Sequence, residues 1–128
     1  GEIMRRADVF VFPSIRELGA GVVVEAMGCG CVPAVVDYGA PAGLVTSRCG
    51  IKVPLATKTR LIERFAEELE GLAHDRVARL AMSEAAHERA MTHFTWDAKA
   101  RKIIEIYEWV TGRRSEQPRF WVDSGSDA

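Results

Sequence analysis

Two glutamates separated by seven residues, Glu17 and Glu25, are the residues of this sequence whose type and spacing best suit chemistry. Between them, Gly19 and Gly21 would let a ligand phosphate approach the backbone closely. The residues after this turn are expected to begin a helix, whose free amides and dipole favour a phosphate or pyrophosphate at its N-terminus. Carboxylates are good acceptors for sugar hydroxyls. This layout therefore suits a ligand that carries ribose, diphosphate and sugar in that order.

Glu25 needs a partner or an exposed position, because it lies in an apolar run, Val22 to Met27, that predicts a largely buried helix. Burying an unpaired carboxylate costs several kcal/mol. We place Glu25 about 9 Å from the phosphate-facing end of the helix, at 1.5 Å per residue, which is about the reach from a pyrophosphate to a ribose. The alternative is a solvated Glu17 and a Glu25 paired with a nearby arginine, and the residues alone leave both interpretations open.

Three short apolar runs indicate the strands that position this turn. Ala7 to Ser14 predicts a strand buried on both faces, as in parallel sheets. Pro33 to Asp37 predicts a second strand, and Ile51 to Val53 a third, after a glycine- and proline-rich loop from Tyr38 to Gly43. Ligands of open α/β sheets bind at the carboxyl ends of the strands, where Glu17 falls. The sequence thus predicts the α/β class, with a Rossmann-like parallel sheet followed by packing helices.

The chain after Pro54 carries helical periodicity. We expect Thr59, Asp75 and Thr95 to be the N-caps of three successive helices, the last of which ends at Gly112. Trp96 and Trp109 are interpreted as packing aromatics. The residues from 113 to 128 lack periodicity and predict a disordered tail.

Composition excludes several classes of function. The chain has 128 residues, 48% hydrophobic and 27% charged, and a formal net charge of -1. No basic field attracts nucleic acid or an anionic membrane. The apolar stretch from Gly19 to Val36 is interrupted by Glu25 and by glycines, which argues against a transmembrane helix, and we find no secretory signal. The three cysteines predict small buried thiols in a reducing compartment, and the three histidines lack metal-ligand spacing, so we expect no metal site.

The segment from Glu17 to Pro33 closely resembles the Glu-x7-Glu signature of retaining family 4 glycosyltransferases with the GT-B fold. The flanking strands and the Phe94-Thr95-Trp96-Asp97 segment with Tyr107 are similar to that family too, so that the resemblance extends over residues 3 to 112. Departures are Gly19 in place of a common aromatic, Gly28 in place of a common alanine, and one extra residue before Pro33. The arginine and lysine pair that holds the diphosphate in that family has no counterpart here.

The resemblance implies a role for each residue of the signature. Glu25 would bind the ribose hydroxyls of a nucleotide-sugar donor, and Glu17 would contact the donor sugar at the reacting centre, as a donor-positioning catalytic residue. Backbone amides of the intervening loop would hold the diphosphate or the sugar; the candidate residues are Leu18, Gly19, Ala20, Gly21 and Val22. No metal and no cofactor is implied, since the nucleotide-diphosphate sugar is itself the donor substrate and the helix N-terminus stabilises the leaving diphosphate.

The resemblance also implies that the chain is a fragment. Residues 1–112 would be the C-terminal part of the nucleotide-sugar-binding domain, and the acceptor-binding N-terminal domain would be missing. The full enzyme, a hexosyltransferase of polysaccharide biosynthesis, would transfer a hexose to a glycan or lipid-linked acceptor. We expect it in the cytoplasm, with peripheral contact at the inner membrane surface through Phe120 and Trp121 as one option and a solvated tail as the other. The alternatives are a GT-B nucleotide-sugar epimerase and a non-catalytic nucleotide-sugar-binding module.

Overall fold

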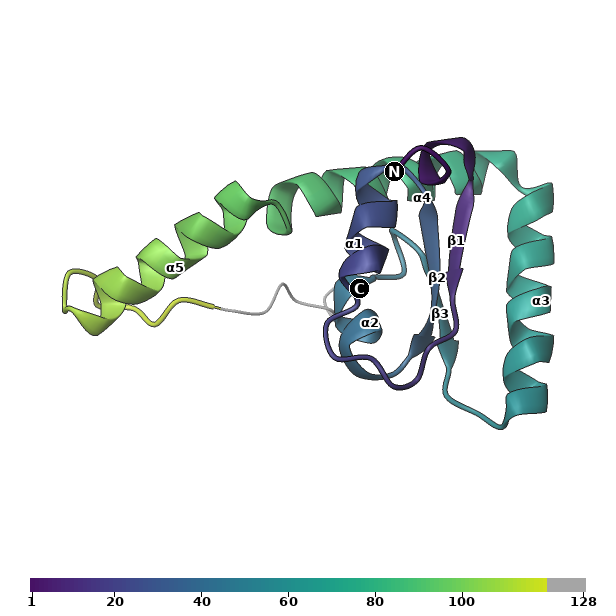
Figure 1. Ribbon diagram of the computed structural model, residues 1–128, viewed down its shortest axis with the longest axis horizontal. Coiled ribbons are helices and arrows are strands. Elements are labelled where there is room, and N and C mark those ends of the chain that lie inside the picture. The colour runs from purple at the N-terminus through teal and green to yellow at the C-terminus, as the bar shows by residue number, and fades with distance from the viewer. Residues whose placement is uncertain (120–128) are drawn as a thin grey trace.

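The computed structural model describes residues 1–119 and contains a parallel sheet of three strands in the order β1-β2-β3 (Figure 1). The strands are β1 (Val9–Phe12), β2 (Val32–Asp37) and β3 (Ile51–Pro54). Val9 of β1 pairs with Val32, and Ala34 of β2 pairs with Ile51. The three predicted strands and the α/β class with a Rossmann-like parallel sheet are confirmed.

Strand β1 differs from its prediction, since it is shorter and is not buried on both faces. Phe10 and Phe12 pack on one face, but Val11 on the other face is 42% exposed. The reason is its position: within residues 1–119, β1 has a hydrogen-bonded neighbour, β2, on one side alone. The apolar run therefore predicted the strand correctly, but it did not predict whether one or both faces of the strand are buried.

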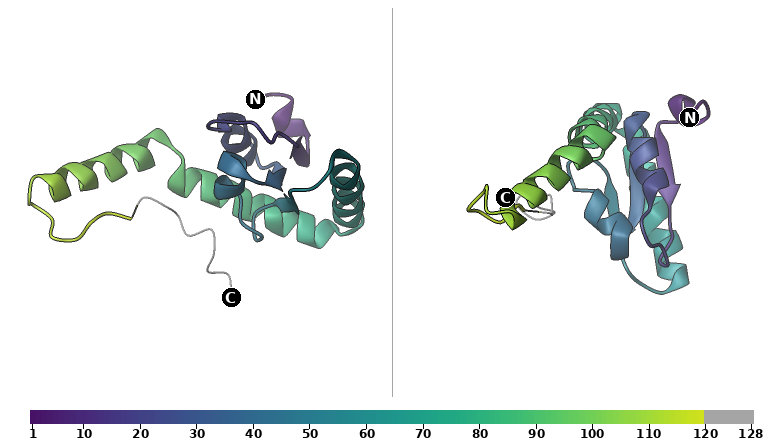
Figure 2. Two further views of the ribbon diagram at one scale, coloured as in Figure 1. Left: turned by 90° about the horizontal axis from the view of Figure 1, so that it is seen from below. Right: turned by 60° about the vertical axis from the view of Figure 1, so that its left-hand side comes forward.

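Helices cover both faces of the sheet (Figures 1 and 2). On one face, α1 (Gly21–Gly28) packs through Val23 and Met27 against Val35 of β2, and α2 (Gly39–Leu44) packs through Leu44 against the same cluster. On the other face, α3 (Lys58–His74) packs through Phe65 and Leu72 against β2 and β3. The polypeptide from β1 through α1 to β2 is thus the predicted crossover between parallel strands.

Helix α2 corrects the prediction of a loop from Tyr38 to Gly43. The helix begins at Gly39, which has a φ of +65°, after an extended Tyr38. Pro41 falls in the first turn, where the missing amide proton costs no helical hydrogen bond. Proline and glycine here start a short helix instead of excluding one.

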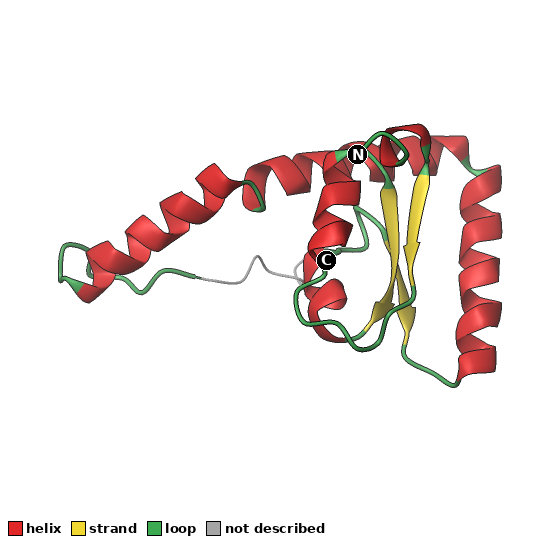
Figure 3. Cartoon of the chain, in the orientation of Figure 1, coloured by secondary structure: helices red, strands yellow, loops and turns green. Residues whose placement is uncertain are grey.

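Helix α4 (Arg76–His93) crosses the edge at which the strands begin, which we call the amino edge, and α5 (Trp96–Val110) extends from it beyond the sheet (Figure 3). The Ser83 hydroxyl donates to the Gly30 carbonyl at 2.6 Å, and His87 Nδ1 lies 2.9 Å from the Gly28 carbonyl oxygen. These contacts join α4 to the end of α1. A single 3-10 turn, Met4–Arg6, precedes β1.

Two of the three predicted N-caps are confirmed. Asp75 Oδ1 accepts from the amide of Ala78 at 2.9 Å, and Thr95 Oγ1 accepts from the amide of Ala98 at 3.2 Å. The N-cap of α3 is Thr57 and not Thr59, because the helix starts two residues earlier than its apolar stripe indicates. The packing role predicted for Trp96 is wrong, because this side chain is 88% exposed.

The Asp75 cap is expected to contribute measurably to stability. Replacing Asp75 with alanine leaves the Ala78 amide without its acceptor and should lower the free energy of unfolding by about 1 kcal/mol. Urea denaturation followed by circular dichroism measures the change. The matched control is Glu84→Ala, which removes an exposed carboxylate within the same helix. Equal stability of the Asp75 variant and the wild type would contradict the capping role.

The described part of the predicted tail, residues 113–119, contains no helix or strand. The amides of Arg113 and Arg114 both donate to the Glu108 carbonyl at the end of α5, at 2.8 and 3.1 Å. The rest of the predicted tail, with Phe120 and Trp121, lies outside the described residues. None of the helices within residues 1–119 is long and apolar enough to cross a membrane.

Candidate functional site

The N-terminus of α1 lies at the carboxyl edge of the sheet because the loop after β1 is short and ends in a left-handed residue. Strand β1 ends at Phe12, and Ala20, with a φ of +49°, is the N-cap of α1. Ala20 is itself buried, so its side chain anchors the loop in the core while its backbone turns the chain into the helix. The turn between the paired glutamates is therefore held at the edge where ligands of parallel sheets bind.

Glu17 folds back onto the loop that it was predicted to flank. Its Oε1 accepts from the amides of Leu18, Gly19 and Ala20, at 3.0, 3.3 and 3.3 Å. The Gly19 amide first, and then the Ala20 amide, lower the pKa of this exposed carboxyl from its ordinary 4.5. Its stabilising effect is thus present above that value and is lost as pH falls. The Glu17 carboxylate thus occupies amides that were predicted to hold a diphosphate or a sugar.

The next two amides of the candidate site remain open to a ligand. The backbone amides of Gly21 and Val22 begin α1 and have no acceptor within the described residues. Leu18 is 98% exposed, and the loop around it is exposed as far as Gly19. All seven predicted residues therefore lie together around one helix N-terminus, but three of the five predicted amides are already occupied.

The Glu25 side chain is exposed, and its carboxylate makes no hydrogen bond or salt bridge within residues 1–119. The apolar residues around it fit this position, since Val23, Ala26 and Met27 are buried and leave one face of α1 to solvent. The alternative of a pair with a nearby arginine is not what the structure contains. Because α1 begins at Gly21, Glu25 lies four residues into the helix, or about 6 Å, and not the predicted 9 Å. It is free to accept from a ligand.

The segment after β2 also reaches the carboxyl edge. Asp37, the last residue of β2, forms a salt bridge of 3.0 Å with Lys52 of β3. This pair links the last residue of β2 to the second residue of β3, and α2 begins at Gly39, two residues after Asp37. Two charges that neutralise each other are poor binders of a sugar phosphate, so Asp37 acts here as a link between strands.

The cysteines have the buried or half-buried positions of structural residues. Cys31 and Cys49 are buried free thiols, as predicted, and burial raises the pKa of Cys31. Cys29 is half-buried. Within residues 1–119, no group of His, Cys, Asp or Glu side chains is arranged to hold a metal ion.

Sequence reasoning missed a second polar site, at the amino edge of the sheet. Arg48, Arg89 and His93 line one cavity there. One signal was present: Arg89 and His93 are four residues apart, which places them on one face of a helix. Arg48 reaches them from a distant loop, and its position follows only from the tertiary fold.

The fold and the site define a class of protein. A parallel sheet with a helix N-terminus at its carboxyl edge is the arrangement at which open α/β domains bind their ligands, and here two exposed glutamates flank that N-terminus. Residues 1–89 match the family described as "Glycosyl transferases group 1". The chain belongs to this family.

One curated protein is similar to this chain over most of the chain's length. Alpha-maltose-1-phosphate synthase of Mycolicibacterium smegmatis is 34% identical to this chain over 113 residues. The match covers 86% of this chain and 29% of that protein, so the chain spans less than a third of the length of its relative.

Proposed function

We propose that this chain is the donor-binding part of a retaining family 4 glycosyltransferase with the GT-B fold, which transfers a hexose from a nucleotide-diphosphate sugar to a glycan or lipid-linked acceptor. The observation that carries the proposal is the pair of exposed carboxylates, Glu17 and Glu25, on either side of the α1 N-terminus at the carboxyl edge of the sheet. Membership of the glycosyl transferases group 1 family supports it. The relative's name states an α-maltose 1-phosphate product, which is consistent with transfer of a hexose.

The donor binds along α1 in this proposal. Glu25 accepts from the ribose hydroxyls, and the amides of Gly21 and Val22 donate to the diphosphate, where the helix dipole also favours negative charge. As the bond from the sugar to the diphosphate breaks, negative charge grows on the leaving oxygen, and donors already aimed at it stabilise the transition state. Neither a metal ion nor a cofactor is part of this proposal.

Glu17 acts as a donor-positioning residue in the same proposal. Its carboxylate leaves the amides of Leu18, Gly19 and Ala20 and accepts from hydroxyls of the donor sugar, which frees those three amides for the ligand. Binding of the donor thus replaces the Glu17 carboxylate with the anionic donor on these loop amides. The acceptor and the remaining diphosphate contacts come from parts of a longer enzyme, which we place in polysaccharide biosynthesis in the cytoplasm, with its acceptor at the inner membrane surface.

The proposal predicts that removing the Glu17 carboxylate lowers the affinity for sugar nucleotides but not the affinity for nucleoside diphosphates. Calorimetric titration of the folded chain with ADP, GDP and UDP, and with their glucose derivatives, should identify one preferred pair. Glu17→Ala should then bind the diphosphate as well as the wild type or better, because three amides are freed, whereas the sugar nucleotide should lose about ten-fold in affinity.

The control is Glu70→Ala, which removes an exposed carboxylate from α3, on the far face of the sheet. It should leave both affinities unchanged. Absence of binding by any nucleotide, or an equal loss for both ligands in Glu17→Ala, would contradict the proposed donor site.

A further inference from the structure

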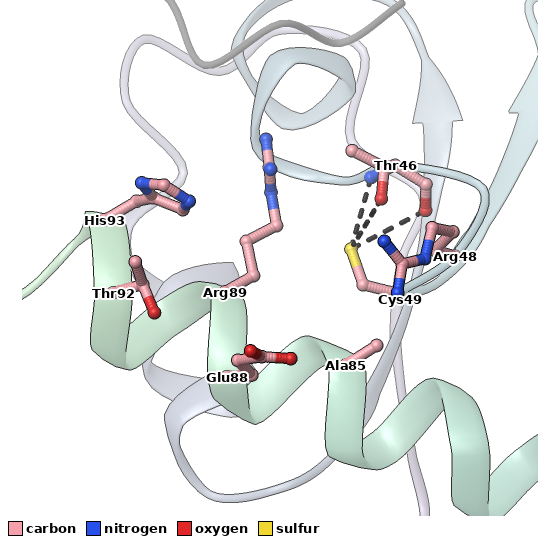
Figure 4. Close-up of a pocket in the computed structure, with 8 residues that line it drawn as sticks. All are labelled: Thr46, Arg48, Cys49, Ala85, Glu88, Arg89, Thr92 and His93. Carbon is pink, nitrogen blue, oxygen red and sulfur yellow. Dashed lines mark hydrogen bonds between the residues drawn. The ribbon is translucent and has the colours of Figure 1, made fainter. Parts of the chain in front are cut away.

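A second polar cavity lies at the amino edge of the sheet, the opposite edge from Glu17 (Figure 4). The loop before β3 and the last turns of α4 line an open cavity of about 240 Å³. Its polar and charged lining consists of Thr46, Arg48, Glu88, Arg89, Thr92 and His93.

Arg89 carries the strongest signal in this cavity. Its Nε donates to the Leu44 carbonyl at the end of α2, at 2.8 Å, and its guanidinium carbon lies 5.7 Å from the Phe94 ring centroid. Its Nη2, however, is buried and has no hydrogen-bond partner within the described residues. Arginine keeps its charge in proteins, so this donor cannot be silenced by losing a proton. A buried charged donor without an acceptor is costly, so an acceptor supplied by a ligand would stabilise Arg89 Nη2.

The charges around Arg89 favour an anion as that acceptor. Arg48 lines the same cavity from an exposed loop position, and Glu88 is the one carboxylate among the lining residues. Burial first, and then Arg89 and Lys102, lower the pKa of His93 from its ordinary 6.5, so its ring is neutral at pH 7. Two cations then face one carboxylate, and the cavity keeps a net positive charge.

The size of the cavity limits the ligand. Pockets for drug-sized ligands usually hold about 300 to 1,000 Å³, and this one is smaller. Thr92 also lines the cavity, on the same last turns of α4 as Arg89 and His93 (Figure 4). A small group with several acceptor oxygens satisfies arginine donors, and the guanidinium fork matches phosphate oxygens in geometry.

We propose that this cavity binds a phosphate group, with Arg89 and Arg48 as its principal ligands and His93 beside it. The group is either free inorganic phosphate or the phosphate of a small ester. The assignment goes beyond the proposed donor site, because the cavity lies at the other end of the strands and shares no residue with it.

The test uses the imidazole of His93 as a local reporter. Other charged groups face His93 from the cavity and from α5; they are Arg48, Glu88, Arg89, Lys99, Arg101, Lys102 and Glu105. Inorganic phosphate is titrated into the whole chain at constant ionic strength, and the histidine resonances are followed by NMR across pH. A bound anion favours the charged imidazolium, so phosphate should raise the pKa of His93 and leave that of His74, on α3, unchanged.

Arg48→Gln is the variant of choice, because Arg48 is exposed, whereas Arg89 also holds Leu44 and could be needed for folding. It should weaken phosphate binding about ten-fold. Arg64→Gln, on exposed α3, is the matched control and should bind as the wild type does. Tighter binding of a hexose 1-phosphate than of inorganic phosphate would assign the site to an ester, and the reverse order to the free ion.

Three results would overturn the proposal. They are the absence of any effect of phosphate on His93, equal weakening in the Arg48 and Arg64 variants, and phosphate shifts confined to the amides of Gly21 and Val22. The last result would place the anion at α1 instead, and would leave the proposed donor site intact.

Discussion

Glu25→Ala is expected to weaken binding of the preferred nucleoside diphosphate by about ten-fold or more, because a hydrogen bond to a charged group contributes about 1.5 to 3 kcal/mol. In the structure, this substitution removes no polar side-chain contact among the described residues. The Glu25 carboxylate is exposed and makes no hydrogen bond or salt bridge within residues 1–119, so its removal leaves no partner orphaned. Calorimetric titration of both proteins with the diphosphate measures the loss.

Two further variants sharpen the result. Glu25→Gln keeps one acceptor oxygen without the charge and should fall between Glu25→Ala and the wild type. Glu70→Ala tests whether any lost carboxylate lowers affinity through net charge alone, and should bind normally. An unchanged affinity in Glu25→Ala would exclude Glu25 from the donor site and would favour the interpretation of this helix as purely structural.

Gly50→Ala is expected to lower the free energy of unfolding by about 3 kcal/mol, at the upper end of the cost of overpacking a core. Gly50 is buried, directly before β3, and a Cβ there would collide with the Pro33 carbonyl oxygen and lie 2.7 Å from Val45 Cγ1. Pro33 belongs to the central strand, which is fixed by ladders on both sides, so the backbone cannot yield cheaply. The urea midpoint should fall by about 1 to 2 M.

Gly71→Ala is the matched control for this substitution. Gly71 is exposed in α3, and a Cβ there meets no atom within 4 Å. Alanine is the better helix former, so this variant should gain about 0.5 to 1 kcal/mol. A Gly50 variant as stable as the wild type would show that the loop before β3 can move away from β2.

The strands and long helices could be predicted because their apolar periodicities are local. Val32 to Asp37 is apolar at nearly every position, and a central strand covered on both faces needs that pattern. The short helix from Gly39 to Leu44 could not be predicted in this way. Glycine and proline usually mark loops, and here a left-handed glycine and a first-turn proline start a helix against β2.

The candidate site was predictable in composition but not in geometry. Spacing placed Glu17 and Glu25 on either side of a helix N-terminus, as the structure has them. It could not show that the Glu17 carboxylate turns back onto its own loop, because that contact depends on a left-handed Ala20 and on side-chain rotamers. The cavity at the amino edge could not be predicted for a different reason. Arg48 and Arg89 are 41 positions apart in the sequence and line the same cavity only because of tertiary packing.

Within residues 1–119, β1 is paired on one side alone, and this pairing affects how the described part of the polypeptide behaves in solution. A strand edge with unpaired amides and carbonyls is a template on which another chain can add a strand. The exposed Val11 side chain provides an apolar contact for that added strand. The pI near 6.4 leaves almost no net charge at neutral pH, so repulsion between molecules is weak. Colloidal stability therefore improves away from the isoelectric point, and concentrated samples at pH 6 to 7 are the ones most prone to aggregation by edge-to-edge association.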